Sequence, residues 1–163
     1  MLLFAAACGG ARRERRGTLQ ASVVRPPPSH DTVRFTAPAV AHRCGRGGAG
    51  GIVIEGVAGG NGVLLWVRSA DSVGDGEYPP LPRGDSTTPR GAMVALRWAP
   101  RVDDARGVTL DSGKVAVTRR SGGFGAVARG SGLEPVAGQR VSLDITFAGV
   151  PLVADTVSCA VQL

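Results

Sequence analysis

The sequence has little of several residue types on which common functions depend. Only two of its 163 residues are histidine, Lys114 is the only lysine among 19 basic residues, and aromatic residues make up 4% of the chain. No segment is apolar over the roughly 18 residues that a membrane-spanning helix needs. These shortages argue against a zinc site, against a nucleic-acid surface of interleaved basic and aromatic side chains, and against a helical membrane protein.

The net charge of +6 does not change this interpretation, because it is concentrated near the start of the chain. Residues 1–30 hold five of the 19 basic residues and only one of the 13 acidic residues. A nucleic-acid-binding domain instead gathers its basic residues on a folded face. The preference for arginine, alanine, glycine and valine is also what a GC-rich coding sequence produces. We therefore expect no nucleic-acid partner.

Glycine (25 residues) and proline (11 residues) are abundant, and valine-rich stretches lie between them. Valine favours strands, and glycine and proline favour the turns that separate them. Turn signals recur every 8–12 residues or so and no segment has a helical period, which favours an antiparallel β-sandwich over a closed barrel. We expect an all-β domain over residues 32–163, immunoglobulin-like in the loose sense, with about eight to ten strands. Candidate strands cover residues 33–36, 39–44, 52–57, 63–68, 77–78, 92–98, 107–110, 114–120, 124–129, 140–147 and 152–163.

Two stretches give the clearest local signals. Residues 52–57 and 63–68 flank a Gly-Asn-Gly turn and predict a hairpin, in which Trp66 is either a core residue or an aromatic platform for a ligand. Residues 140–147 alternate between apolar and polar side chains, which predicts a strand with one face buried. Its expected buried side chains are Val141, Leu143, Ile145 and Phe147.

The N-terminus contains a short apolar run that ends in Ala-Ala-Ala-Cys at residues 5–8. It resembles the lipobox of bacterial lipoproteins, with an apparently truncated signal because no basic residue precedes the run. The resemblance implies cleavage before Cys8, acylation of Cys8 and a lipid contact with the membrane. Residues 1–8 are then a remnant signal, and the Arg/Pro-rich residues 9–31 a flexible tether. A cytosolic protein with an accidental match is the alternative.

The last 60 residues or so also resemble strand repeats in uncharacterised secreted bacterial β-sandwich lipoproteins. The stretches concerned are Gly-Lys-Val-Ala-Val at residues 113–117, Gly-Phe-Gly-Ala at residues 123–126 and Val-Ser-Leu-Asp-Ile-Thr-Phe at residues 141–147. This resemblance implies a fold and a location in the cell envelope, at the outer membrane or in the periplasm. It implies no functional residue.

The chain has three cysteines, an odd number for an exported protein. If Cys8 carries lipid, Cys44 and Cys159 remain as a pair, and a disulfide between them would join an early strand to the last one. The alternative is two reduced thiols in a cytosolic protein.

Residues 69–91 form the longest irregular segment and contain the only weak candidate for a metal site. Asp71, Asp75 and Glu77 place three carboxylates on one glycine-bearing loop, as a calcium ion requires. Their spacing does not match an EF-hand, and a solvated acidic loop is the alternative.

Catalytic and cofactor motifs are lacking. The two histidines, His30 and His42, lie in the expected tether and in an expected strand, and the chain has no Gly-x-Ser-x-Gly elbow. The glycine-rich residues 45–51 lack the Gly-Lys-Ser/Thr ending of a phosphate-binding loop. We expect neither an enzyme nor a cofactor.

Together these patterns predict a lipid-anchored protein of the cell envelope with a non-catalytic binding or structural role. Its loops would contact a protein or glycan partner, and its oligomeric state stays open. One alternative is an envelope hydrolase or calcium-binding module that uses the acidic residues 71–85. The other is a cytosolic β-domain of unknown role.

Overall fold

The computed structural model describes residues 16–45, 51–70, 72–85, 87–101 and 103–159. They form ten strands, and no helix among them has the length and apolar content needed to cross a membrane. The strands are β1 (Gly17–Val24), β2 (Thr32–Cys44), β3 (Gly51–Ala58), β4 (Asn61–Arg68), β5 (Gly76–Tyr78), β6 (Gly91–Arg101), β7 (Asp104–Thr109), β8 (Ser112–Arg120), β9 (Gly123–Glu134) and β10 (Gln139–Val157).

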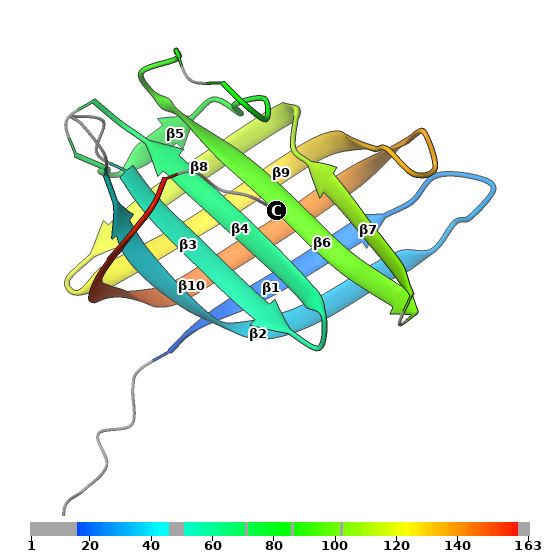
Figure 1. Ribbon diagram of the computed structural model, residues 1–163, viewed down its shortest axis with the longest axis horizontal. Coiled ribbons are helices and arrows are strands. Elements are labelled where there is room, and N and C mark those ends of the chain that lie inside the picture. Colours follow the sequence, from blue (N-terminus) through cyan, green and yellow to red (C-terminus); the bar gives the residue numbers. More distant parts are fainter. Residues whose placement is uncertain (1–15, 46–50, 71, 86, 102, 160–163) are drawn as a thin grey trace, which may run out of the picture.

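All ten strands belong to one sheet, in the order β5-β8-β9-β10-β1-β2-β3-β4-β6-β7, and neighbours in this order are antiparallel. The sheet folds over so that β3, β4, β6 and β7 lie in front of β8, β9, β10 and β1 (Figure 1). Beyond β5, Pro80 forms a parallel bridge with Ala92 of β6. The expected all-β class and antiparallel pairing are confirmed.

Alternating side chains of both layers fill the space between them. On β10, Val141, Leu143, Ile145 and Phe147 are all at most 3% exposed, as their period of two predicts. Trp98 of β6 is the largest fully buried side chain of the described residues. The sequence pattern therefore identifies the buried face of this strand correctly.

β1 contradicts the expectation that residues 9–31 form a flexible tether. Gly17–Val24 lies between β10 and β2, and every second residue, Leu19, Ala21 and Val23, is at most 4% exposed. Arginines and prolines on either side conceal this short alternating stretch in the sequence. The folded domain thus includes residues 17–31, whereas Cys8 lies outside the described residues.

β10 is a single strand of 19 residues where two strands, 140–147 and 152–163, were expected. Its first part pairs with β1 and β9, and its register shifts between Phe147 and Val150. Beyond the start of β1, Val157 pairs directly with Cys44 of β2, in parallel. Gly17 permits this approach, because a Cβ there would overlap the backbone of Val150.

The 52–57 and 63–68 hairpin is confirmed as β3 and β4, but Trp66 does not lie in the core. Val63, Leu65 and Val67 face the core with at most 2% exposure, so Trp66 points to the outer face of the sheet. There the guanidinium of Arg68 lies 4.5 Å from the centre of the indole ring. Of the two interpretations left open by the sequence, the core position is therefore excluded; both faces of β4 carry apolar side chains, so the pattern alone did not decide between them.

Candidate functional site

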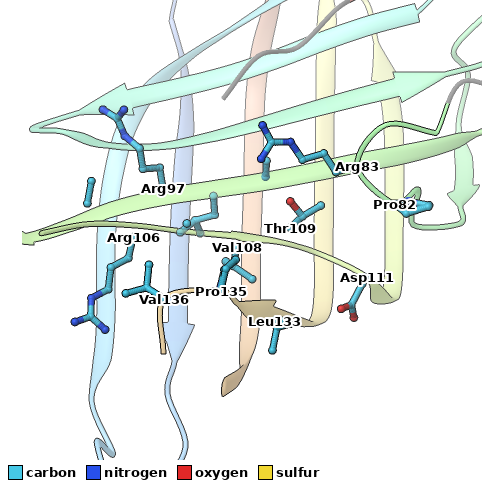
Figure 2. Close-up of a pocket in the computed structure, with 14 residues that line it drawn as sticks. Pro82, Arg83, Arg97, Arg106, Val108, Thr109, Asp111, Leu133, Pro135 and Val136 are labelled. Atoms are coloured by element: carbon cyan, nitrogen blue, oxygen red, sulfur yellow. The ribbon is translucent and has the colours of Figure 1, made fainter. Parts of the chain in front are cut away.

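A groove of about 470 Å³ lies along β7, the strand at one end of the sheet (Figure 2). We call it the β7 groove; its lining residues are Pro82, Arg83, Ala95–Arg97, Ala105–Thr109, Asp111, Leu133, Pro135 and Val136. The groove lies where the outer face of β6 and β7 carries little side-chain volume, because its residues there include Ala95, Ala105 and Gly107. A Cβ placed on Gly107 would have no neighbour closer than 3.6 Å.

The walls of the β7 groove combine apolar side chains with positive charge. Leu133 is 48% and Val136 69% exposed, and both side chains lie at this one groove. Figure 2 shows them with Pro135 on one side of the β6–β7 hairpin and Arg83 and Arg97 on the other. The arrangement suits a ligand that has apolar groups and negative charge.

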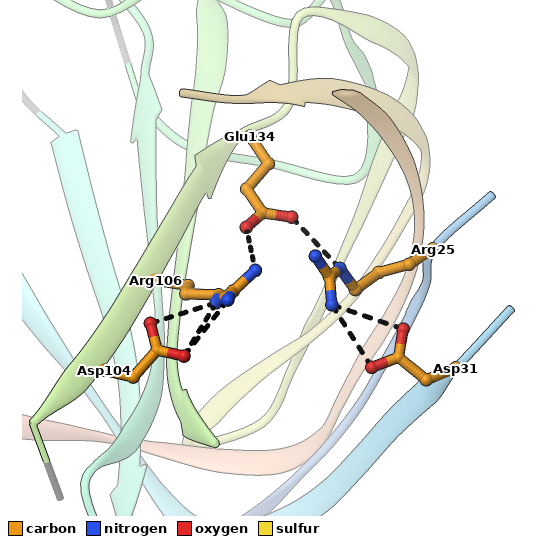
Figure 3. Close-up of polar contacts among 5 residues, drawn as sticks. All are labelled: Arg25, Asp31, Asp104, Arg106 and Glu134. Carbon is orange, nitrogen blue, oxygen red and sulfur yellow. Dashed lines mark hydrogen bonds and ion pairs between the residues drawn. The ribbon is translucent and has the colours of Figure 1, made fainter. Parts of the chain in front are cut away.

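A chain of charged side chains lies beside the groove, at the end of the sheet that carries the β1–β2, β6–β7 and β9–β10 turns (Figures 1 and 3). Glu134, with a side chain 0% exposed, accepts hydrogen bonds from Arg25 Nε at 3.2 Å and Arg106 Nη1 at 2.9 Å. Asp31 lies 3.3 Å from Arg25, and Asp104 lies 3.0 Å from Arg106. Each guanidinium therefore bridges two carboxylates.

This charged cluster holds Arg106 in one orientation at the groove. The hydrogen bonds from Arg106 lower the pKa of Asp104, and Asp104 and then Glu134 raise the pKa of Arg106. Arg106 is charged in any physiological condition and is already paired. It shapes the groove more than it supplies free positive charge.

Of the three carboxylates proposed for calcium, Asp75 and Glu77 lie in the described part of the chain, and each has a different partner. Asp75 accepts a hydrogen bond from the backbone N–H of Arg119, and Glu77 lies 3.7 Å from Lys114 at the surface. Asp71 lies outside the described residues. Over the described ranges, no three histidine, cysteine or acidic side chains are placed to hold a metal ion.

The remainder of the acidic 71–85 segment is anchored by Asp85 and Arg68. Asp85 accepts hydrogen bonds from the hydroxyl and N–H of Thr88 and from the N–H of Thr87, which lower its pKa to about 2. Arg68, only 7% exposed, donates to the carbonyl oxygens of Asp85 and Thr88, both at 2.7 Å. These groups hold the loop in place.

Cys44 and Cys159 form the expected disulfide, with their Cα atoms 5.0 Å apart. It joins the end of β2 to the residues after β10, where these two strands already pair. The two histidines lie in different surroundings. His30 is exposed in the β1–β2 turn, and His42 Nε2 lies 3.6 Å from the carboxylate of Glu55. The buried Nδ1 of His42 has no hydrogen-bond partner among the described groups.

Sequence reasoning missed both the β7 groove and the charged cluster. Glu134 is separated from Arg25 by 109 positions and from Arg106 by 28, so no local pattern connects them. The one available signal was an acidic residue, Glu134, between Leu133 and Pro135 in an apolar setting. The small residues of the groove floor carry no sequence signature of a site.

The fold and the groove define the chain as an all-β, disulfide-linked domain with an apolar, arginine-rimmed hollow along an edge strand. No protein-family model, no curated protein and no solved structure matches it.

Proposed function

We propose that this chain is a lipid-anchored protein of the cell envelope with a non-catalytic binding role, exercised through the β7 groove. The observation that carries the proposal is the disulfide between Cys44 and Cys159. Disulfides of this kind persist in exported proteins and are rare in the reducing cytosol. With these two cysteines paired, Cys8 is the remaining thiol, in the lipobox-like sequence where acylation would occur.

The binding role is supported by the combination of a filled core and a hollow on the surface. The interior between the two layers is occupied by side chains, whereas the groove exposes Leu133 and Val136. Exposed apolar side chains that gather in one hollow are typical of a binding site.

A non-catalytic role is supported by the state of the ionisable groups. The carboxylates at or beside the groove, Asp104, Asp111 and Glu134, are each held by an arginine. In the described part of the chain, His42 contacts a carboxylate and no hydroxyl or thiol nucleophile.

The test is metabolic labelling of the full chain with a radioactive fatty acid, followed by fractionation of the cells and thiol titration after denaturation. The wild type is expected to carry label, to enter the membrane fraction and to show no free thiol. The matched variant Cys8→Ser is expected to lose the label and the membrane association but to keep the disulfide. Unlabelled wild type with free thiols at Cys44 and Cys159 would refute the proposal.

A further inference from the structure

β7 is the last strand of the sheet and has one neighbour, β6. No other strand in the described ranges pairs with its outer edge. The edge of a sheet presents backbone N–H and C=O groups that can pair with a further strand, and proteins usually cover or charge such edges. Here the outer edge opens into the β7 groove, which makes it accessible instead.

The hydrogen bonds of the β6–β7 ladder show which residues of β7 point their backbone groups into the groove. The N–H of Leu110, which follows β7, donates to the carbonyl of Val94 at 2.9 Å. In an antiparallel pair, alternate residues direct both backbone groups to the same neighbour. Ala105, Gly107 and Thr109 therefore direct theirs away from β6.

The surroundings of Thr109 agree with this assignment. A Cβ added to Gly132 of β9 would overlap the carbonyl oxygen of Thr109, so this oxygen points away from β6. The backbones of β7 and β9 are therefore close at Thr109 and Gly132. Towards Ala105 the outer edge of β7 borders the groove.

The side chains around this edge set the chemistry of a partner. Two of the four exposed large hydrophobic side chains of the described residues, Leu133 and Val136, lie at the groove. The charged residues of the lining are Arg83, Arg97 and Arg106 against Asp111, which is itself paired with Arg140. Arg106 is paired with Asp104 and Glu134, so the positive charge that favours an acidic partner is that of the exposed Arg97.

We propose that the β7 groove binds an extended, acidic segment of a partner protein as an added strand beside β7. The segment pairs its backbone with Ala105 and Gly107, directs apolar side chains towards Leu133 and Val136, and places carboxylates near Arg97. Backbone pairing supplies affinity and the side-chain contacts supply selectivity, as in other cases of strand addition. This inference rests on the proposed binding role and specifies its partner.

The test uses the full chain and capped hexapeptides of alternating glutamate and valine as probes. NMR titration and amide hydrogen exchange report binding residue by residue. Saturable binding is expected, with slower exchange of the amides of Ala105 and Gly107. A peptide with lysine in place of glutamate is expected to bind at least about tenfold more weakly, because its charges face the arginines.

N-methylation of the probe separates strand addition from simple adhesion. Alternate residues of an added strand face β7, so methylating one set, the glutamates or the valines, is expected to abolish binding while the other set is tolerated. Equal tolerance of both peptides would overturn the proposal. Failure of the glutamate–valine peptide to bind at all would also overturn it.

A substitution on the protein provides a second readout. Arg97→Glu is expected to weaken binding of the glutamate–valine peptide by about tenfold and to strengthen binding of the lysine–valine peptide. The control Arg34→Glu, at an exposed position on β2, is expected to change the affinity for neither peptide. Binding of dodecanoate in the groove without any peptide binding would overturn strand addition and leave the broader binding role standing. If the wild type carries no fatty-acid label at Cys8, that result counts against the proposed lipid anchor and leaves the strand-addition proposal unaffected.

Discussion

The two ends of the folded sheet are closed by different chemistry. At one end, next to the start of β2, five charged side chains join the β1–β2 turn, β7 and β9. At the other end, a single covalent bond joins Cys44 of β2 to Cys159. The ends lie on opposite sides of the molecule in Figure 1.

The difference lies in what each closure depends on. The disulfide persists only where thiols are oxidised, and it acts largely by restricting the unfolded chain. The charged cluster works in any redox environment, but removal of one partner leaves a buried charge unpaired. Only the charged end borders the β7 groove, so the closure that carries no covalent bond also shapes the binding surface.

Removal of the disulfide is expected to have the largest effect. Cys44 and Cys159 are separated by 115 positions, and a closed loop of this size is worth up to about 5 kcal/mol in the chain-entropy model. The double variant Cys44→Ser/Cys159→Ser is therefore expected to lose about 2–5 kcal/mol of unfolding free energy, measured by urea denaturation. Reduction of the wild type should produce the same loss, and Cys8→Ser should produce none.

Glu134→Gln tests the opposite end. It removes the charge that both Arg25 and Arg106 contact, and breaking a buried ion pair in this way costs about 3–5 kcal/mol. Each guanidinium keeps one aspartate, so we expect a loss near the lower limit. The matched variant Glu77→Gln, at a surface position, should leave the urea midpoint unchanged. A negligible loss in Glu134→Gln would mean that this end is closed by packing alone.

How far the sequence predicts this molecule depends on the range of the interactions. Alternation within residues 140–147 and the turn between residues 58 and 63 are local, and both predictions are confirmed. The disulfide was predictable because the possible partners were so few. β1 was missed because its eight-residue alternating stretch lies between arginines and prolines that dominate the local composition.

The candidate site was beyond the reach of local patterns. Glu134 meets Arg25 and Arg106 only after β1, β7 and β9 have taken their places in the sheet. The groove depends on the register of β6 and β7, which pairs Ala95 with Thr109 and Arg97 with Gly107. Such positions are fixed by the whole fold, and a single sequence does not display them.

Arg68→Gln is expected to have a smaller and more local effect. Its guanidinium donates to the carbonyls of Asp85 and Thr88, and loss of these bonds from a buried group costs about 1–3 kcal/mol. The loop between β5 and β6 should then open more often and be cut faster by trypsin after Arg83 and Arg90. Arg34→Gln, on an exposed part of β2, serves as the control and should leave the cleavage rate unchanged.

Asp85→Asn is expected to have the smallest effect on stability, and that effect is recognised by its dependence on pH. Hydrogen bonds from Thr88 and Thr87, and the charge of Arg68, lower its pKa from 3.8 to about 2 in the folded protein. A depressed pKa means that the folded state favours the carboxylate, so Asp85 contributes its full stability above about pH 5. This contribution is lost as the pH falls from about 4 to about 2.

The melting temperature of Asp85→Asn should therefore lie below that of the wild type at neutral pH and converge with it in acid. The exposed variant Asp155→Asn should show no such convergence, and a constant difference for Asp85→Asn would show that its carboxylate charge is not what holds the loop.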